Sequence, residues 1–146
     1  MKLRLQMVPA LDTLAQLSDT LEAALLRHGV AREHVSLARL IVEELACKTL
    51  EHGHLASGQP PVEVTLQVDT GALVLEFHDS GPTFDLRAAP LPDLDAEIAE
   101  RPIGSLGLHL VRQFADQIDY RHDAGRNVAR ITLLNHFDPI PQEFPA

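Results

Sequence analysis

The feature that most restricts the fold is an alternation of apolar and polar residues between positions 62 and 77. The apolar positions keep one phase on both sides of a turn sequence: Val62, Val64, Leu66 and Val68, then Leu73, Leu75 and Phe77. Such alternation indicates strands with one buried face, and Asp69-Thr70-Gly71 is typical of the turn that joins them. We therefore expect a hairpin with one face covered.

The remaining elements follow from periodicity and from turn residues. Residues 2–7 alternate and predict a short strand at a sheet edge. Residues 10–28 and 32–52 carry apolar residues at spacings of three and four, which predicts two amphipathic helices. A third helix is expected to open at Gly104-Ser105-Leu106-Gly107, and a second hairpin to follow over 118–134.

This order of elements separates helices from antiparallel pairs and predicts the α+β class. The expected architecture is a two-layer α/β sandwich, a mixed and mostly antiparallel sheet of about five strands with three helices on one face. The 146 residues suit one domain over 1–134, with 135–146 as a C-terminal tail containing three prolines. The acidic stretch rich in Pro and Ala that ends near Pro102 is interpreted as a mobile loop.

Composition excludes several classes of function. Twelve basic against 21 acidic residues give a net charge of -9, which disfavours nucleic acid as a partner. One cysteine excludes an internal disulfide or a multi-cysteine zinc site, and the first residues lack the pattern of a signal peptide. No apolar run approaches the roughly 20 residues that span a bilayer. The expected setting is the cytoplasm, without membrane attachment.

Three stretches could carry chemistry, and each also has a plain structural interpretation. Glu44 and Lys48 are neighbours on a helix, where an exposed ion pair would contribute about 0.2 to 0.5 kcal/mol. Asp79-Ser80-Gly81-Pro82 ends a strand and could hold a ligand or form only a tight turn. Gly104 and Gly107 could present free N–H groups to a phosphate at a helix start.

Together these stretches resemble the GHKL (Bergerat-fold) ATP-binding superfamily, and within it the anti-sigma-factor serine/threonine-protein kinases of bacterial partner switching. The helix motif matches LIVEELACKTLEHG at Glu44, Lys48, His52 and Gly53. The strand-end motif matches FHDSGPTFD at Asp79, Gly81, Phe84 and Asp85. The phosphate motif matches GSLGLHLVRQFAD at Gly104, Gly107, Leu108 and Asp116. The resemblance covers about residues 8–134 and implies a histidine-kinase-like ATPase fold.

The resemblance also implies roles, with ATP or ADP as the ligand. Asp79 would accept a hydrogen bond from the adenine amino group, and Gly81 would let the base approach the backbone. Gly104, Ser105, Leu106, Gly107 and Leu108 would cradle phosphate, with residues 87–102 as a lid. Glu44 would orient or deprotonate the attacking serine hydroxyl or water. The implied partners are a small antagonist protein and a sigma factor or other output protein, and a homodimer is suggested.

Three positions differ from the family pattern. Lys48 replaces the asparagine that binds Mg²⁺, Thr83 replaces a glycine of the strand-end motif, and Ser105 replaces a glycine of the phosphate motif. An ammonium has no lone pair for a metal, so Lys48 would either neutralise phosphate directly or pair with Glu44. Thr83 could bind a phosphate or a base nitrogen through its hydroxyl. The alternative function is a non-catalytic interaction module of the same fold.

Other reactive side chains give weaker patterns. Glu51, His52, His54 and His78 lack the His-Glu-x-x-His spacing that places two imidazoles on one helix face, and no metal site is predicted. Cys47 has no evident activating base besides the neighbouring lysine and is interpreted as an inert thiol.

Overall fold

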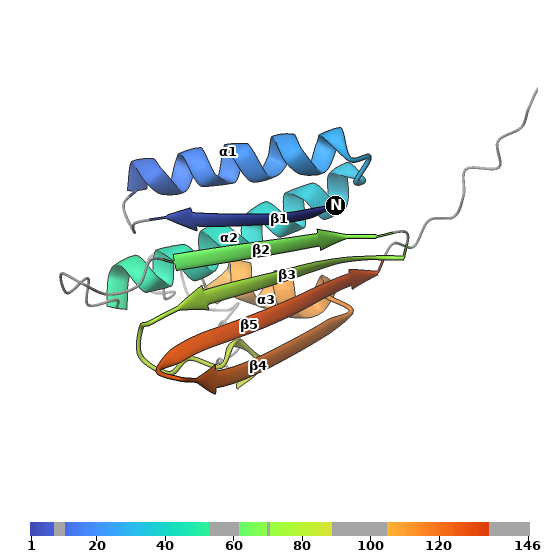
Figure 1. The fold of residues 1–146 in the computed structure, drawn as a ribbon. Coiled ribbons are helices and arrows are strands. Elements are labelled where there is room, and N and C mark those ends of the chain that lie inside the picture. Colours follow the sequence, from blue (N-terminus) through green and yellow to red (C-terminus); the bar gives the residue numbers. More distant parts are fainter. Residues whose placement is uncertain (8–10, 53–61, 70, 89–104, 135–146) are drawn as a thin grey trace, which may run out of the picture.

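The computed structural model describes residues 1–7, 11–52, 62–69, 71–88 and 105–134 (Figure 1). In chain order the elements are β1 (Lys2–Met7), α1 (Leu11–Arg27), α2 (Arg32–His52), β2 (Val62–Val68), β3 (Ala72–Asp79), the 3-10 turn η1 (Leu86–Ala88), α3 (Ser105–Phe114), β4 (Gln117–Asp123) and β5 (Arg126–Leu134). The elements expected from periodicity are therefore present. The predicted lid beyond residue 88 and the tail over 135–146 lie outside the described residues.

The strands form one sheet in the order β1-β2-β3-β5-β4, with β1 at an edge as predicted. Each pairing is antiparallel, so the expectation of a mixed sheet is wrong for the described strands. In the central pairs, Leu75 lies opposite Leu66 on one side and Ile131 on the other. This register places the apolar residues of neighbouring strands in common rows.

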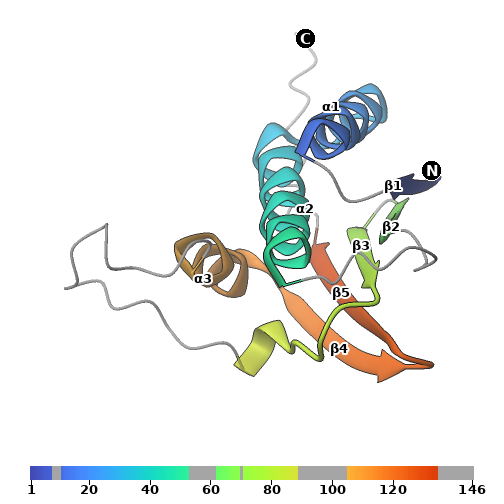
Figure 2. The same cartoon turned by 90° about the vertical axis from the view of Figure 1, so that its left-hand side faces the viewer.

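The three helices cover one face of the sheet (Figure 2). Six inward residues of the central strands are at most 1% exposed: Val64, Leu66, Leu75, Phe77, Ile131 and Leu133. They share the core with Ile41 and Val42 of α2 and with Leu86 of η1. Alternation in the strands and the helical period in α2 therefore direct both sets of side chains into a single apolar layer. The α+β two-layer architecture is confirmed.

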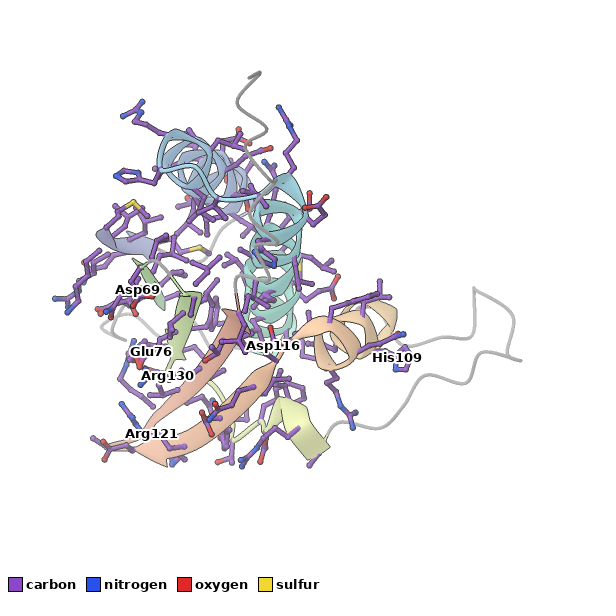
Figure 3. All side chains as sticks on the ribbon, turned by 90° about the vertical axis from the view of Figure 1, so that its right-hand side faces the viewer. Asp69, Glu76, His109, Asp116, Arg121 and Arg130 are labelled. Atoms are coloured by element: carbon purple, nitrogen blue, oxygen red, sulfur yellow. The ribbon has the colours of Figure 1, made fainter. Side chains whose placement is uncertain are left out.

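The opposite face of the sheet carries charged side chains. Glu76, Arg121 and Arg130 project from this face in Figure 3, away from the helices. Glu76 on β3 lies directly opposite Arg130 on β5, a cross-strand position at which unlike charges are favourable. None of the described helices combines the length and the apolar character needed to cross a bilayer.

The arrangement of β3, β4 and β5 positions the candidate site. Ala124 and Gly125, with φ of 52° and 76°, connect β4 to β5 through the two-residue turn that suits a twisted hairpin. Because β3 and β5 are antiparallel, the carboxyl end of β3 lies beside the start of β5. Asp79 therefore faces Asn127 across the sheet, next to the loop that leads into η1.

Candidate functional site

A pocket of about 310 Å³ lies between the second half of α2 and the loop that follows β3. Its walls come from both elements: Leu45, Lys48 and Thr49 on α2, then Asp79, Gly81, Pro82, Thr83 and Phe84. The volume is at the lower end of the range for small-molecule sites, roughly 300 to 1,000 Å³. The fold thus brings together four of the residues predicted to bind a nucleotide, although Lys48 and Thr83 are 35 positions apart.

Asp79 is the carboxylate at the end of β3 that the sequence singles out. Its Oδ1 accepts hydrogen bonds from the Gly81 backbone N–H at 2.8 Å and from Asn127 Nδ2 at 3.0 Å. Both bonds use the same oxygen, so Oδ2 is the atom available to a donor on a ligand. A Cβ at position 81 would lie 3.1 Å from Asp79 Oδ1, which explains why a glycine suits this turn.

Asn127 on β5 forms hydrogen bonds with this loop. The sequence alone did not identify it as a site residue. Its side chain is buried, with the residue 4% exposed. The amide nitrogen donates to Asp79 Oδ1, to the Gly81 carbonyl at 3.1 Å and to the Pro82 carbonyl at 2.9 Å. A single side chain on β5 therefore satisfies three acceptors of the loop that lines the pocket.

The amide oxygen of Asn127 receives donors from two other segments. The Phe84 backbone N–H donates to it at 3.2 Å, and the Tyr120 hydroxyl also donates to it. One signal in the sequence could have identified this residue. In β5, alternation places position 127 on the same inward face as Ala129 and Ile131, where a polar side chain needs partners.

Lys48 contacts an aromatic ring in the pocket wall. Its Nζ lies 4.4 Å from the centre of the Phe84 ring, a cation–π geometry. Among the ion pairs of the described residues, none joins Lys48 to Glu44. The lysine therefore brings a positive charge to the lining of the pocket, which also includes Asp79.

Glu44 lies one helical turn before Lys48 and faces a different element. A Cβ at Gly107, in the first turn of α3, would overlap the Glu44 carboxyl group and lie 2.7 Å from its Cγ. Because glycine has no side chain, the Glu44 carboxylate can approach the start of α3. The first N–H groups of a helix have no acceptor within it, and they favour a negative charge there. The structure brings the predicted base and the predicted phosphate motif into contact across 63 positions.

The other residues of the predicted phosphate motif differ in what they can contribute. Ser105 and Leu106 begin α3, and Gly104 lies outside the described residues. Leu108 is 3% exposed and packs in the core. Its side chain therefore belongs to the apolar layer, and only its backbone could face a phosphate.

The other two aspartates matched by the family motifs, Asp85 and Asp116, have structural contacts. Asp85 accepts hydrogen bonds from the Arg87 side chain, and these bonds hold the pKa of the Asp85 carboxyl below its usual range. Asp116 Oδ2 accepts from the Leu134 backbone N–H at 2.7 Å, which links the end of α3 to the end of β5 (Figure 3). Neither residue lines the pocket.

The donor set at position 48 does not fit a magnesium ion. Mg²⁺ prefers oxygen ligands, and the lysine ammonium offers only hydrogen-bond donors. Within the described residues, no cluster of three histidine, cysteine or carboxylate side chains could hold a metal. The Nε2 of His78, one of the residues considered above for metal binding, lies 3.3 Å from Glu76 Oε2.

A second hollow, of about 590 Å³, lies between α2 and α3 and is larger than the first. It is bordered mainly by apolar side chains, Leu37, Leu40, Leu110 and Phe114, with Glu33, His34, Ser36 and Asp116. None of the residues predicted to bind nucleotide lines it. The smaller pocket is the better candidate because its lining combines an acceptor, a cation and an aromatic ring.

Comparison with protein families gives an independent result. Residues 7–133 match the family described as histidine kinase-like ATPase domain. The match spans most of the chain, and the chain therefore belongs to this family. The superfamily inferred from the three motifs is confirmed, and the anti-sigma-factor subfamily stays a prediction. A search of curated proteins found no sequence match.

The contact between Glu44 and Gly107 generates a stability prediction. Gly107→Ala should lower the free energy of unfolding by about 1 to 3 kcal/mol, because the new methyl group overlaps the carboxylate. Gly71→Ala is the matched control, since nothing lies within 4 Å of a Cβ at that position. Urea unfolding measures both. Adding Glu44→Ala should recover most of the loss, and a Gly107→Ala variant as stable as the wild type would show that this contact is absent.

Proposed function

We propose that this protein is an ATP-binding regulator of the anti-sigma-factor kinase type, which phosphorylates a serine on a small antagonist protein. The nucleotide would bind in the pocket between α2 and the loop from Asp79 to Phe84. The observation that carries the proposal is the arrangement of Asp79, which lines the pocket and whose Oδ1 accepts from two donors, so that Oδ2 would be the acceptor for a ligand. The family match supports nucleotide binding in general.

The base end of the pocket suits an amino-purine. A carboxylate offers only acceptors, so Asp79 Oδ2 would take a hydrogen bond from the exocyclic amino group of adenine. Guanine presents a carbonyl oxygen at the corresponding ring position, which the carboxylate would repel. The apolar side chain of Leu45 provides a surface against which a flat base can lie.

The phosphate end would use the lysine and the start of α3. Lys48 supplies positive charge that can neutralise phosphate oxygens directly. The N–H groups of the first turn of α3, which have no acceptor within the helix, would give a second, metal-independent source of positive potential. In an anti-sigma-factor kinase the Mg²⁺ ion neutralises phosphate charge. Here the lysine would take over part of that task.

Glu44 is the proposed catalytic base. Its carboxylate lies at the start of α3, one helical turn from Lys48, so a serine hydroxyl reaching this region would meet an acceptor beside the phosphate-binding elements. Phosphoryl transfer depends mainly on positioning and charge neutralisation, with one acceptor for the hydroxyl proton. Glu44 would orient the hydroxyl and take that proton.

The partners belong to the same proposal. A small antagonist protein would supply the serine, and a sigma factor or other output protein would be held and released in response. The protein would act in the cytoplasm, as a homodimer. Nucleic acid is a poor direct partner, because the net charge of -9 opposes binding to a polyanion.

A second candidate is a non-catalytic interaction module of the same family. The observation that favours it is Lys48, whose ammonium replaces a metal ligand and rests on the Phe84 ring. A single point charge cannot bridge several phosphate oxygens as a metal ion does. The two candidates differ in whether phosphate is transferred, and both retain a nucleotide pocket.

Replacing the acceptor tests the nucleotide site. Asp79→Ala should weaken ATP binding by roughly tenfold to a hundredfold, because a lost acceptor strands a donor at a cost of about 1 to 3 kcal/mol. Asp69→Ala is a matched control, since the Asp69 carboxylate also accepts from the backbone N–H two residues on but lies in the β2–β3 turn. Calorimetric titration measures both variants. Wild-type protein that releases no heat with millimolar ATP would refute the site.

Replacing Lys48 separates the two candidates. ATP binding by the wild type should depend little on Mg²⁺, and phosphoryl transfer should be slow, because the lysine stands where a metal ligand is needed. Lys48→Asn should make binding depend on Mg²⁺ and raise the transfer rate. Lys2→Asn, at the other lysine of the chain, is the control and should change neither property.

The measurements are ATP titrations with and without Mg²⁺ and a phosphorylation assay on each protein. Strong Mg²⁺-dependent binding together with rapid transfer by the wild type would contradict the assignment of Lys48. Absent transfer by both the wild type and Lys48→Asn, with ATP binding retained, would favour the non-catalytic module.

A further inference from the structure

Asn127 is unusual because its side-chain amide is buried in an apolar layer and both its nitrogen and its oxygen form hydrogen bonds. Ser18 and Asn127 are the buried polar residues of the described chain, and the hydroxyl of Ser18 has no hydrogen-bond partner there. The Asn127 side chain, in contrast, takes part in five hydrogen bonds. A buried group with this many partners fixes the geometry of the segments that it joins.

The partners of Asn127 fix which way the amide points. Its NH₂ group has two hydrogens and three acceptors, at 2.9, 3.0 and 3.1 Å, while its oxygen has two donors. Turning the amide around would place the oxygen against three acceptors and the NH₂ group against two donors. Because two hydrogens serve three acceptors, at least one hydrogen is shared between acceptors.

These bonds join two residues of the pocket lining, Asp79 and Phe84. On one side the amide holds Asp79 Oδ1, which leaves Oδ2 for the base. On the other side it accepts from the Phe84 backbone N–H, and the Phe84 ring carries the Lys48 ammonium. Asn127 is not among the residues that line the pocket. It nevertheless contacts both Asp79, which would recognise the base, and Phe84, whose ring lies against the Lys48 ammonium.

We propose that Asn127 is a positioning residue that sets the orientation of Asp79 relative to Phe84 and so determines the preference of the pocket for adenine over guanine. This inference rests on the proposed nucleotide binding. Without the amide, the Asp79 carboxylate loses one of the two donors that hold Oδ1 and can turn about its side-chain bonds. The carbonyls of Gly81 and Pro82 lose a donor at the same time, so the loop from 79 to 84 loosens.

Three variants test the inference. Asn127→Ala removes the whole amide, and Asn127→Asp keeps its shape but replaces the donor with an acceptor facing Asp79. Tyr120→Phe is the control: it removes one donor to the amide oxygen and one of the two acceptors of the Phe84 N–H, and it leaves the three bonds donated by Asn127 in place. Each folded protein is titrated with ATP and with GTP, and the ratio of the two dissociation constants is compared.

The wild type and Tyr120→Phe should prefer ATP, with similar ratios. Asn127→Ala and Asn127→Asp should bind ATP at least tenfold more weakly, and their ratio should fall at least tenfold. A folded Asn127→Ala variant that keeps the wild-type affinity and ratio would overturn the inference and leave the proposed function standing. A wild type that binds neither nucleotide would overturn the proposed function itself, and this inference with it.

If circular dichroism shows that both Asn127 variants are unfolded, NMR of the wild type tests the positioning role instead. The side-chain NH₂ resonances of Asn127 should shift during an ATP titration, with the same dissociation constant as the calorimetric heat. The resonances should respond less to GTP at equal occupancy. Resonances that stay unchanged at saturating ATP would overturn the positioning role.

Discussion

The antiparallel pairing of β3 with β5 is the constraint on which the candidate site depends. It places Asp79 opposite Asn127 at the edge of the apolar layer, where the strand ends and the loop into η1 begins. The register itself is fixed by burial, since Phe77 and Ala129 face each other toward the helices. A slip of one residue would turn these side chains to the charged face and remove Asn127 from the loop. The register between β3 and β5 therefore sets both the packing of the core and the geometry of the site.

The helical period of α2 places some of its side chains in the core and others in the lining of the pocket. Ile41 and Leu45 are buried against the sheet, and Lys48 continues along the helix into the pocket lining. Glu44 lies on the neighbouring side and contacts the first turn of α3 at Gly107. The same spacing that buries the apolar face thus sets an anion and a cation about one turn apart, each toward a different wall of the site.

The layered fold could be predicted from the sequence because its signals are local. Alternation between Val62 and Phe77 reports strand and buried face together, and the helical stretches differ from it in period. The residues lining the pocket could be named in part through motif resemblance, as Lys48, Asp79, Gly81 and Thr83 show. The strand at residues 2–7 also lies at an edge of the sheet, as predicted.

The contacts that complete the site could not be predicted, because they join positions far apart in the chain. Lys48 meets Phe84, Glu44 meets Gly107, and Asn127 meets Asp79, and no local pattern relates the members of these pairs. Lys48 illustrates the difficulty. Its helical neighbour Glu44 is the expected partner by spacing, but the ammonium lies on an aromatic ring supplied by the loop after β3.

Backbone amide chemical shifts recorded during an ATP titration would locate the nucleotide site on the fold. We expect the largest shifts at Gly81, Thr83 and Phe84, around Lys48, and in the first turn of α3. Shifts confined to the hollow bordered by Leu37 and Phe114, or no shifts at millimolar ATP, would contradict the assignment of the pocket beside Asp79 as a nucleotide site.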